Sequence, residues 1–235
     1  MDEMEFIMPN ELQSQITEIS SRDMIRYFHK GWTVYFNSVP PSRESIWILL
    51  SYWAIVTDWG SNIYNYNVGN IPSEDGDGYD YIYRPECKLL KIDEAKKLKN
   101  KDPGLVSITY NGSPKHDAIV WFLPSHKFSR FRAYQSISEG IVDYFCRLVR
   151  SLPSETWKLV READAGALAA DLERLGWVSE PLITATGCGF ADALGKYLNA
   201  YKTIEFDYDS LTAFTDDEKE QIKNLIGFSL IEMEK

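Results

Sequence analysis

The chain is poor in cysteine, and this scarcity excludes a small scaffold held together by disulfides. Its 235 residues include three cysteines, Cys87, Cys146 and Cys188, an odd number without the spacing of a metal site. The three histidines are scattered as well, so the sequence predicts no zinc site. Glycine-rich phosphate loops and Gly-x-Ser-x-Gly elbows are also missing, and we expect no cofactor.

The chain has fewer basic than acidic residues. With 35 acidic and 25 basic residues the net charge is −10, an average field that repels a phosphate backbone and argues against a nucleic-acid partner. Aromatic residues make up 14% of the chain and occur along its whole length. This composition excludes a disordered protein and is typical of a globular one.

Long hydrophobic runs are absent too. The longest, Ile46–Val56, is about half of the roughly 20 residues that span a bilayer, so we expect no membrane span. The N-terminal residues Met1–Glu5 are acidic and do not resemble a secretory signal. The sequence therefore predicts a soluble protein, cytoplasmic as synthesised. Delivery to the cell wall or periplasm would need a non-standard route or a particle.

Helical periodicity dominates both ends of the chain. Residues 10–30 predict one or two amphipathic helices with a break near Ser20 and Ser21. Ser42 is a candidate N-cap for a helix through Val56. Because residues 46–56 are apolar on every side, we expect this helix to be buried at the centre of the domain.

The middle of the chain predicts a small β lobe at about residues 71–125. Alternating Tyr79–Tyr83, Val106–Tyr110 and Ala118–Leu123 are strand candidates, and Asn111-Gly112 is a hairpin-type turn. Residues 88–100 predict a short basic helix.

Further helices follow the β lobe. Their predicted starts are a capping box at Ser136–Glu139, Pro153-Ser154, Asp164 and Phe190. The expected fold class is α+β, mainly α. Residues 1–204 would form the main domain, and 205–235 a C-terminal extension with a helix from about Asp216 to Ile226.

Three segments together resemble a known family. The first is Ala54–Ser61 (AIVTDWGS) with the asparagine-rich Tyr64–Ile71 (YNYNVGNI). It resembles the central-helix end of bacterial lysozyme-like peptidoglycan hydrolases, namely the glucosaminidases of glycoside hydrolase family 73 and the flagellar muramidases. In those proteins the corresponding segment has the sequence small-apolar-Glu-Ser/Thr-Gly-Trp-Gly, followed by an asparagine-rich turn.

The other two segments come in the family's order. Phe131–Gly140 (FRAYQSISEG) is similar to its strand-to-helix junction, and Asp171–Pro181 (DLERLGWVSEP) to its leucine helix and following turn. The match covers about residues 40–202. The resemblance implies a lysozyme-like fold: a buried central helix, a β lobe beside a cleft, and a C-terminal helical lobe.

One departure from the family concerns catalysis. The family's general acid is the Glu three residues before Trp-Gly, and Val56 occupies that position here. Glycoside cleavage needs a carboxylic acid near the leaving oxygen, which valine cannot supply. Asp58 replaces the family's glycine and is the candidate for a relocated acid. Two residues along a helix correspond to a rotation of about 200°, so the Asp58 side chain would point away from the face on which residue 56 lies. Capping a turn or exposure to solvent is therefore the favoured interpretation of Asp58.

More distant carboxylates are a further possibility for the acid. Glu74, Asp75, Asp77 and Asp80 lie in a polar turn of the β lobe, where most such side chains are simply solvated.

Aromatic and amide side chains surround the expected cleft. Sugar faces stack on aromatic rings, and amides hydrogen-bond acetamido and hydroxyl groups. The candidate substrate-binding residues are Trp59, Tyr64, Asn65, Asn67, Asn70 and Tyr81. For any single aromatic residue a place in the core is the favoured interpretation, whereas the group as a whole supports a groove.

Three functions are compatible with these residues. One is a lysozyme-like protein that recognises peptidoglycan or another N-acetylated glycan with weak or no hydrolysis. Another is an active glucosaminidase or muramidase that uses a relocated acid such as Asp58. The third is an acidic structural, adaptor or immunity protein of a phage or injection system, with a protein partner.

Overall fold

The computed structural model describes residues 9–36, 39–110, 117–178, 189–218 and 220. The chain divides into two compact units. The β unit comprises Met1–Gln15 and Asn70–Tyr134, and the helical unit comprises Ile16–Gly69 and Gln135–Lys235. In the described residues no helix is both long and apolar enough to cross a membrane. The predicted division at residue 204 stays a prediction.

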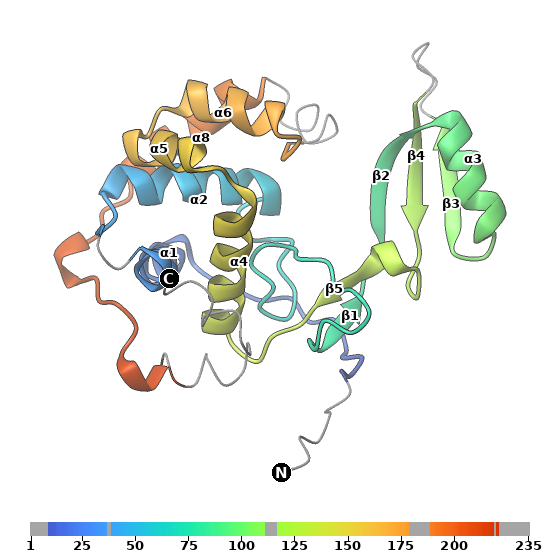
Figure 1. Cartoon of the computed structure of the whole chain (residues 1–235), viewed down its shortest axis with the longest axis horizontal. Coiled ribbons are helices and arrows are strands. Elements are labelled where there is room, and N and C mark those ends of the chain that lie inside the picture. Colours follow the sequence, from blue (N-terminus) through green and yellow to red (C-terminus); the bar gives the residue numbers. More distant parts are fainter. Residues whose placement is uncertain (1–8, 37–38, 111–116, 179–188, 219, 221–235) are drawn as a thin grey trace. The chain divides into compact units, whose positions relative to one another are not determined.

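The helical unit is built around one buried helix. Its helices are α1 (Ser21–Tyr35), α2 (Arg43–Thr57), α4 (Ile137–Ser151), α5 (Ser154–Glu162), α6 (Ala165–Arg174) and α8 (Phe190–Lys202), with a 3-10 turn at Tyr208–Ser210. Helix α2 packs against α1, α5 and α8, and α4 packs against α1. Figure 1 shows α5, α6 and α8 on one side of α2 and α1 on the other. The expectation of a central buried helix is confirmed.

Local signals place three of these helices. Ser42, Ser136 and Asp164 each accept a hydrogen bond from a backbone N–H of the first helical turn, as their N-cap positions predicted. The Glu139 carboxylate also accepts from the backbone N–H of Gln135 at 3.0 Å, which completes the capping region of α4.

The β unit contains two small antiparallel sheets. Its elements are β1 (Tyr81–Tyr83), β2 (Glu86–Lys91), α3 (Ile92–Lys101), β3 (Val106–Tyr110), β4 (Asp117–Phe122), a 3-10 turn (Lys127–Ser129) and β5 (Arg130–Arg132). One sheet has the order β2-β4-β3 and the other pairs β1 with β5. Helix α3 lies beside the three-stranded sheet (Figure 1), and the core between them contains Ala95, Val106, Val120 and Phe122. The class, α+β and mainly α, is confirmed.

The predicted helix over residues 10–30 is wrong in its first half. Residues before Ser21 are extended: Leu12 donates its backbone N–H to the Tyr81 carbonyl at 2.8 Å, and Thr17 donates to Ile63 at 2.9 Å. The apolar spacing of this stretch fits either conformation, and pairing with distant backbone satisfies its polar groups. Helix α1 instead begins after Ser20 and runs to Tyr35.

The predicted helix over residues 88–100 is also wrong at its start. Lys88 to Lys91 belong to β2, where they pair with β4, and α3 begins at Ile92. The strand partner lies some thirty residues away along the chain, so no local pattern reveals it.

Two further predicted features fall largely outside the described residues. The Asn111-Gly112 turn does so entirely. Of the predicted helix from Asp216 to Ile226, residues 216–218 and 220 are helical and the others lie outside the described part.

Candidate functional site

The end of α2 is shaped by three consecutive residues with positive φ. Asp58, Trp59 and Gly60 have φ of 49°, 56° and 86°. The Thr57 hydroxyl donates to the Trp53 carbonyl at 2.8 Å and accepts from the Gly60 N–H at 3.1 Å. A side chain at Gly60 would be strained by this conformation and would come within 3.1 Å of the Trp53 ring. The helix therefore ends sharply within the Asp-Trp-Gly segment.

A cavity of about 140 Å³ lies beside this helix end, within the helical unit. The cavity is lined by residues of α2, the asparagine-rich turn and α4, and by Trp177, which follows the turn after α6. The lining residues are Tyr52, Trp53, Val56, Thr57, Val68, Gly69, Tyr144, Arg147 and Trp177. The first and third segments of the family resemblance thus meet at one cavity, and α4, which begins within the second segment, contributes Tyr144 and Arg147.

Val56, which the resemblance aligns with the family's acid, lines this cavity. It is the residue before the last of α2 and is half-buried, so the expectation of full burial is wrong. Helix α2 ends at the next residue, and Val56 is one of the residues of its last turn that line the cavity.

Two tyrosines of the lining carry strongly raised pKa values. Burial raises the pKa of Tyr52 to about 12, and the nearby Arg147 guanidinium opposes part of this rise. Burial also raises the pKa of Tyr144, with the neighbouring Tyr52 phenol adding to the effect and Arg147 again opposing it. Both phenols are therefore protonated at neutral pH.

Asp58 does not line the cavity. Its backbone forms the left-handed C-cap of α2, and its exposed carboxylate accepts a hydrogen bond from the Ser61 hydroxyl at 3.0 Å. This is the turn-capping, solvent-exposed placement that the helical geometry favoured. The role of Asp58 as a relocated acid stays a prediction.

The predicted substrate-binding residues divide between the two units. Trp59 is 41% exposed and stacks on Tyr197 of α8, with ring centroids 4.9 Å apart. Tyr64 and Asn65 are partly exposed in the turn after α2, and Asn67 is buried. Asn70 and Tyr81 belong to the β unit. None of these six residues lines the 140 Å³ cavity, and their binding role stays a prediction.

Sequence reasoning missed four residues of the cavity, namely Tyr52, Tyr144, Arg147 and Trp177. Tyr144 and Arg147 are three residues apart on α4, and this spacing places them on one helix face. This spacing could have indicated that the two side chains act together. It does not indicate which other helix this face of α4 packs against.

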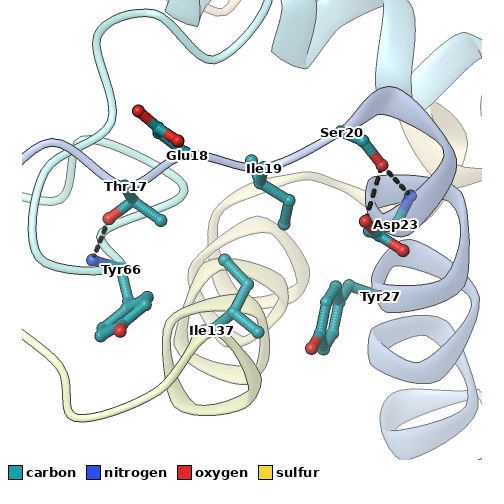
Figure 2. A pocket seen from close by; sticks show the side chains of 8 residues that line it. All are labelled: Thr17, Glu18, Ile19, Ser20, Asp23, Tyr27, Tyr66 and Ile137. Carbon is teal, nitrogen blue, oxygen red and sulfur yellow. Dashed lines mark hydrogen bonds between the residues drawn. The ribbon is translucent and has the colours of Figure 1, made fainter.

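A second cavity of about 460 Å³ lies elsewhere in the helical unit and is acidic. Its lining residues are Thr17, Glu18, Ile19, Ser20, Asp23, Tyr27, Tyr66 and Ile137. Figure 2 shows the Tyr66 and Tyr27 rings on opposite sides of Ile137. The Asp23 carboxylate accepts from the Ser20 hydroxyl and from Arg26, both at 2.6 Å. Asp23 therefore stabilises the first turn of α1 through its contacts with Ser20 and Arg26.

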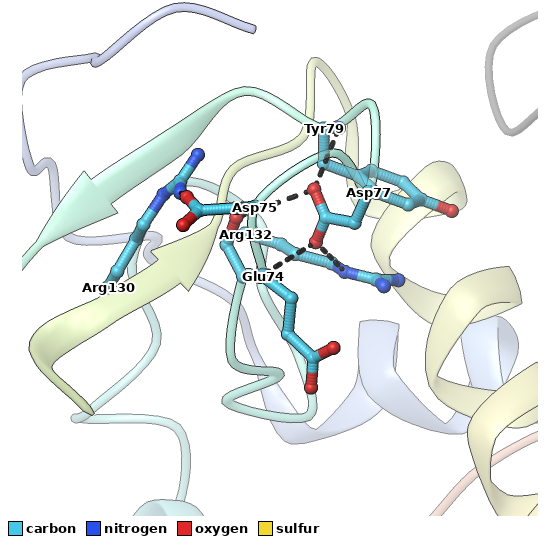
Figure 3. Close-up of polar contacts among 7 residues, drawn as sticks. Glu74, Asp75, Asp77, Tyr79, Arg130 and Arg132 are labelled. Atoms are coloured by element: carbon cyan, nitrogen blue, oxygen red, sulfur yellow. Dashed lines mark hydrogen bonds and ion pairs between the residues drawn. The ribbon is translucent and has the colours of Figure 1, made fainter. Parts of the chain in front are cut away.

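The carboxylates of the acidic turn in the β unit hold that turn together (Figure 3). Asp77 accepts hydrogen bonds from the backbone N–H groups of Glu74 and Tyr79 at 3.0 and 3.1 Å, and from Arg132 at 3.1 Å. The Asp77 oxygens are thus engaged in structural contacts.

Two other carboxylates of this turn are engaged in the same way. Asp75 pairs with Arg130, and Asp80 accepts from the Asn10 backbone N–H at 2.8 Å. In the described residues no group of three or more His, Cys, Asp or Glu side chains is arranged to hold a metal ion.

Comparison with known proteins adds one weak likeness. No protein-family model matches the chain, and no curated protein matches it. Among solved structures, it is similar to a C-terminally truncated glycoside hydrolase domain of FlgJ from Salmonella typhimurium. The TM-score is 0.39 and the identity 15%, over 79% of this chain and 100% of the other. At this TM-score we base no conclusion on the likeness.

Proposed function

We propose that this chain is a lysozyme-like protein that recognises peptidoglycan or a related N-acetylated glycan and cleaves it weakly or not at all. The observation that carries the proposal is that residues of the first and third resembling segments, together with α4, line one cavity beside the end of α2. In the family, the end of the central helix carries the general acid. A shared binding place is the simplest reason for this combination of residues.

The chemistry of the cavity argues against efficient hydrolysis. General acid catalysis needs a protonated carboxyl group within hydrogen-bond reach of the leaving oxygen, and it contributes about 10²–10⁴-fold to the rate. Val56 has no proton to donate, and no residue of the described lining is acidic. Arg147, which lines the same cavity, would also favour the ionised form of any carboxyl group placed there.

The test is a paired binding and cleavage assay on the full chain. We expect the protein to sediment with purified insoluble peptidoglycan and to bind chitin oligosaccharides, while releasing little or no reducing sugar compared with an active muramidase. Asp58→Asn should leave both binding and any residual release unchanged, because the Asp58 carboxylate is exposed and lies outside the cavity lining.

Other outcomes separate the remaining hypotheses. Robust release of reducing sugar that Asp58→Asn abolishes would contradict the proposal and make Asp58 the acid. Neither binding nor cleavage would also contradict it, and would favour an adaptor or immunity role with a protein partner.

A further inference from the structure

Two largely buried tyrosines line the cavity at the end of α2. Tyr52 and Tyr144 are 7% and 5% exposed, and both line the cavity. Among the residues that the structure describes, neither phenol has a hydrogen-bond partner. Tyrosine rings are buried here while their hydroxyl groups keep hydrogen-bonding capacity. Two such residues at one cavity can offer O–H donors to a partner that enters from outside.

Arg147 lines the same cavity and is exposed to solvent. Some other arginines in the described structure pair with carboxylates, as Arg132 does with Asp77 and Arg174 with Asp171. Within the same described part, no carboxylate pairs with Arg147. It is also the one charged residue among the described lining. The side of the cavity formed by α4 therefore carries a single positive charge.

Two other polar groups of the lining are already satisfied within the protein. The Trp53 indole N–H donates to the Val68 carbonyl at 3.1 Å, and the Thr57 hydroxyl is engaged on both sides. A guanidinium and two phenol O–H groups are left for a ligand. All are donors at neutral pH, since burial keeps both phenols protonated.

A cluster of donors with one positive charge fits an anionic acceptor. A carboxylate is the natural choice, because the arginine fork matches its two oxygens and charge-assisted hydrogen bonds are strong. The size of the cavity limits the group that can accompany the carboxylate. At about 140 Å³ it has room for a few water-sized groups, and Val56 and Val68 give it apolar walls.

We propose that this cavity binds a carboxylate carried next to a methyl-sized apolar group, with Arg147, Tyr52 and Tyr144 donating hydrogen bonds to its oxygens. That the ligand comes from peptidoglycan rests on the proposed function. Peptidoglycan offers this chemistry in two places. One is the lactyl ether of an N-acetylmuramic acid whose carboxylate is free, and the other is the C-terminal alanine of a stem peptide.

Matched probes test the carboxylate directly by isothermal titration calorimetry on the full chain. N-Acetylmuramic acid is compared with N-acetylglucosamine, which lacks the lactyl group. N-Acetyl-D-alanyl-D-alanine is compared with its C-terminal amide. We expect at least one carboxylate probe to bind about tenfold or more tightly than its neutral counterpart, as charge-assisted hydrogen bonds predict.

Variants locate the binding at this cavity. Arg147→Gln should weaken the carboxylate probe about tenfold or more and leave the neutral probe unchanged. Tyr52→Phe and Tyr144→Phe remove only the hydroxyl groups and should each weaken it several-fold. Arg150→Gln is the matched control, because Arg150 is exposed on the same helix but does not line the cavity. Circular dichroism checks that each variant is folded.

The outcomes separate this proposal from the proposed function. If peptidoglycan and chitin oligosaccharides bind but neither carboxylate probe does, or if Arg147→Gln changes nothing, the carboxylate site is wrong and glycan recognition stands. If a carboxylate probe binds through Arg147 but peptidoglycan does not, the carboxylate site stands and glycan recognition fails. Preference for the muramic acid or for the dialanine probe identifies the source.

Discussion

Val56 and Arg147 together decide what chemistry is available at the end of α2. A buried general acid must stay protonated until it meets the leaving oxygen, and enzymes achieve this by placing it among apolar side chains. By the resemblance, Val56 takes the position of the family's acid, and the Arg147 guanidinium lines the same cavity. The cavity therefore combines an apolar side chain at that position with a positive charge.

Restoring the acid alone should therefore fail. In Val56→Glu, the nearby Arg147 would lower the pKa of the new carboxyl group and hold it ionised at neutral pH. We expect no measurable release of reducing sugar from peptidoglycan by Val56→Glu. The double variant Val56→Glu/Arg147→Leu should have a higher pKa at this carboxyl group and is the variant in which turnover would first appear.

The comparison needs one matched control. Val56→Gln/Arg147→Leu has the same shape but no titratable group, so any activity it shows is unrelated to acid catalysis. Turnover by Val56→Glu equal to that of the double variant would show that Arg147 does not influence this position.

The contact between α4 and the asparagine-rich turn sets the position of that turn. Gly140, in the first part of α4, lies directly against the backbone of Tyr66: a Cβ atom there would come within 1.9 Å of the Tyr66 carbonyl oxygen. Because the obstacle is backbone, it cannot rotate away. Val68 and Gly69, which line the cavity, come two and three residues later.

Gly140→Ala should therefore destabilise the protein by about 1–3 kcal/mol, the usual cost of overpacking a core. Gly195→Ala in α8 is the opposite case. Nothing lies within 4 Å of its added Cβ atom, so the lower flexibility of alanine should stabilise the helix by about 0.5–1 kcal/mol. Urea denaturation followed by circular dichroism measures both. Equal effects of the two variants would contradict the close contact.

The segment after α8 contributes to the stability of the helical unit. Phe214 is 3% exposed, with the Lys30 ammonium 4.9 Å from its ring centroid. Lys30 also pairs with Glu218 at 2.7 Å. The Tyr208 ring packs edge-on against Trp47 of α2, with centroids 5.6 Å apart. These contacts join residues 206–218 to α1 and to the start of α2.

Glu218 makes this attachment dependent on pH. Hydrogen bonds from the Lys30 ammonium and the Thr215 N–H lower the pKa of its carboxyl group. Its ionised form therefore stabilises the folded state at neutral pH, and this contribution is lost as the pH falls from about 4.3 through the lowered pKa. Because the pair is partly exposed, we expect Glu218→Gln to cost less than about 1 kcal/mol at pH 7.

Urea denaturation of both proteins at pH 7 and pH 3 measures this contribution. The difference between wild type and Glu218→Gln should be present at pH 7 and smaller at pH 3. A difference that grows as the pH falls would contradict the assignment.

The sequence alone determined the parts of the fold that depend on neighbours a few residues away. Ser42, Ser136 and Asp164 cap helices because a side-chain oxygen satisfies backbone N–H groups in the next turn. The all-round apolar pattern of residues 46–56 was enough to predict a buried central helix. The resemblance of Ala54–Ser61 to the lysozyme-like hydrolases implied that Val56 takes the position of their acid.

Tertiary contacts determined the conformation of the segments whose sequence pattern is ambiguous. Residues 10–20 and 88–91 carry patterns that suit a helix or an extended chain, and hydrogen bonds to Tyr81, Ile63 and β4 made them extended. The cavity depends on the same kind of long-range contact. Tyr144 and Arg147 lie about ninety residues after Tyr52, and they share a lining only because α4 packs beside the end of α2. Burial and electrostatic environment arise from that packing, so no local pattern contains them.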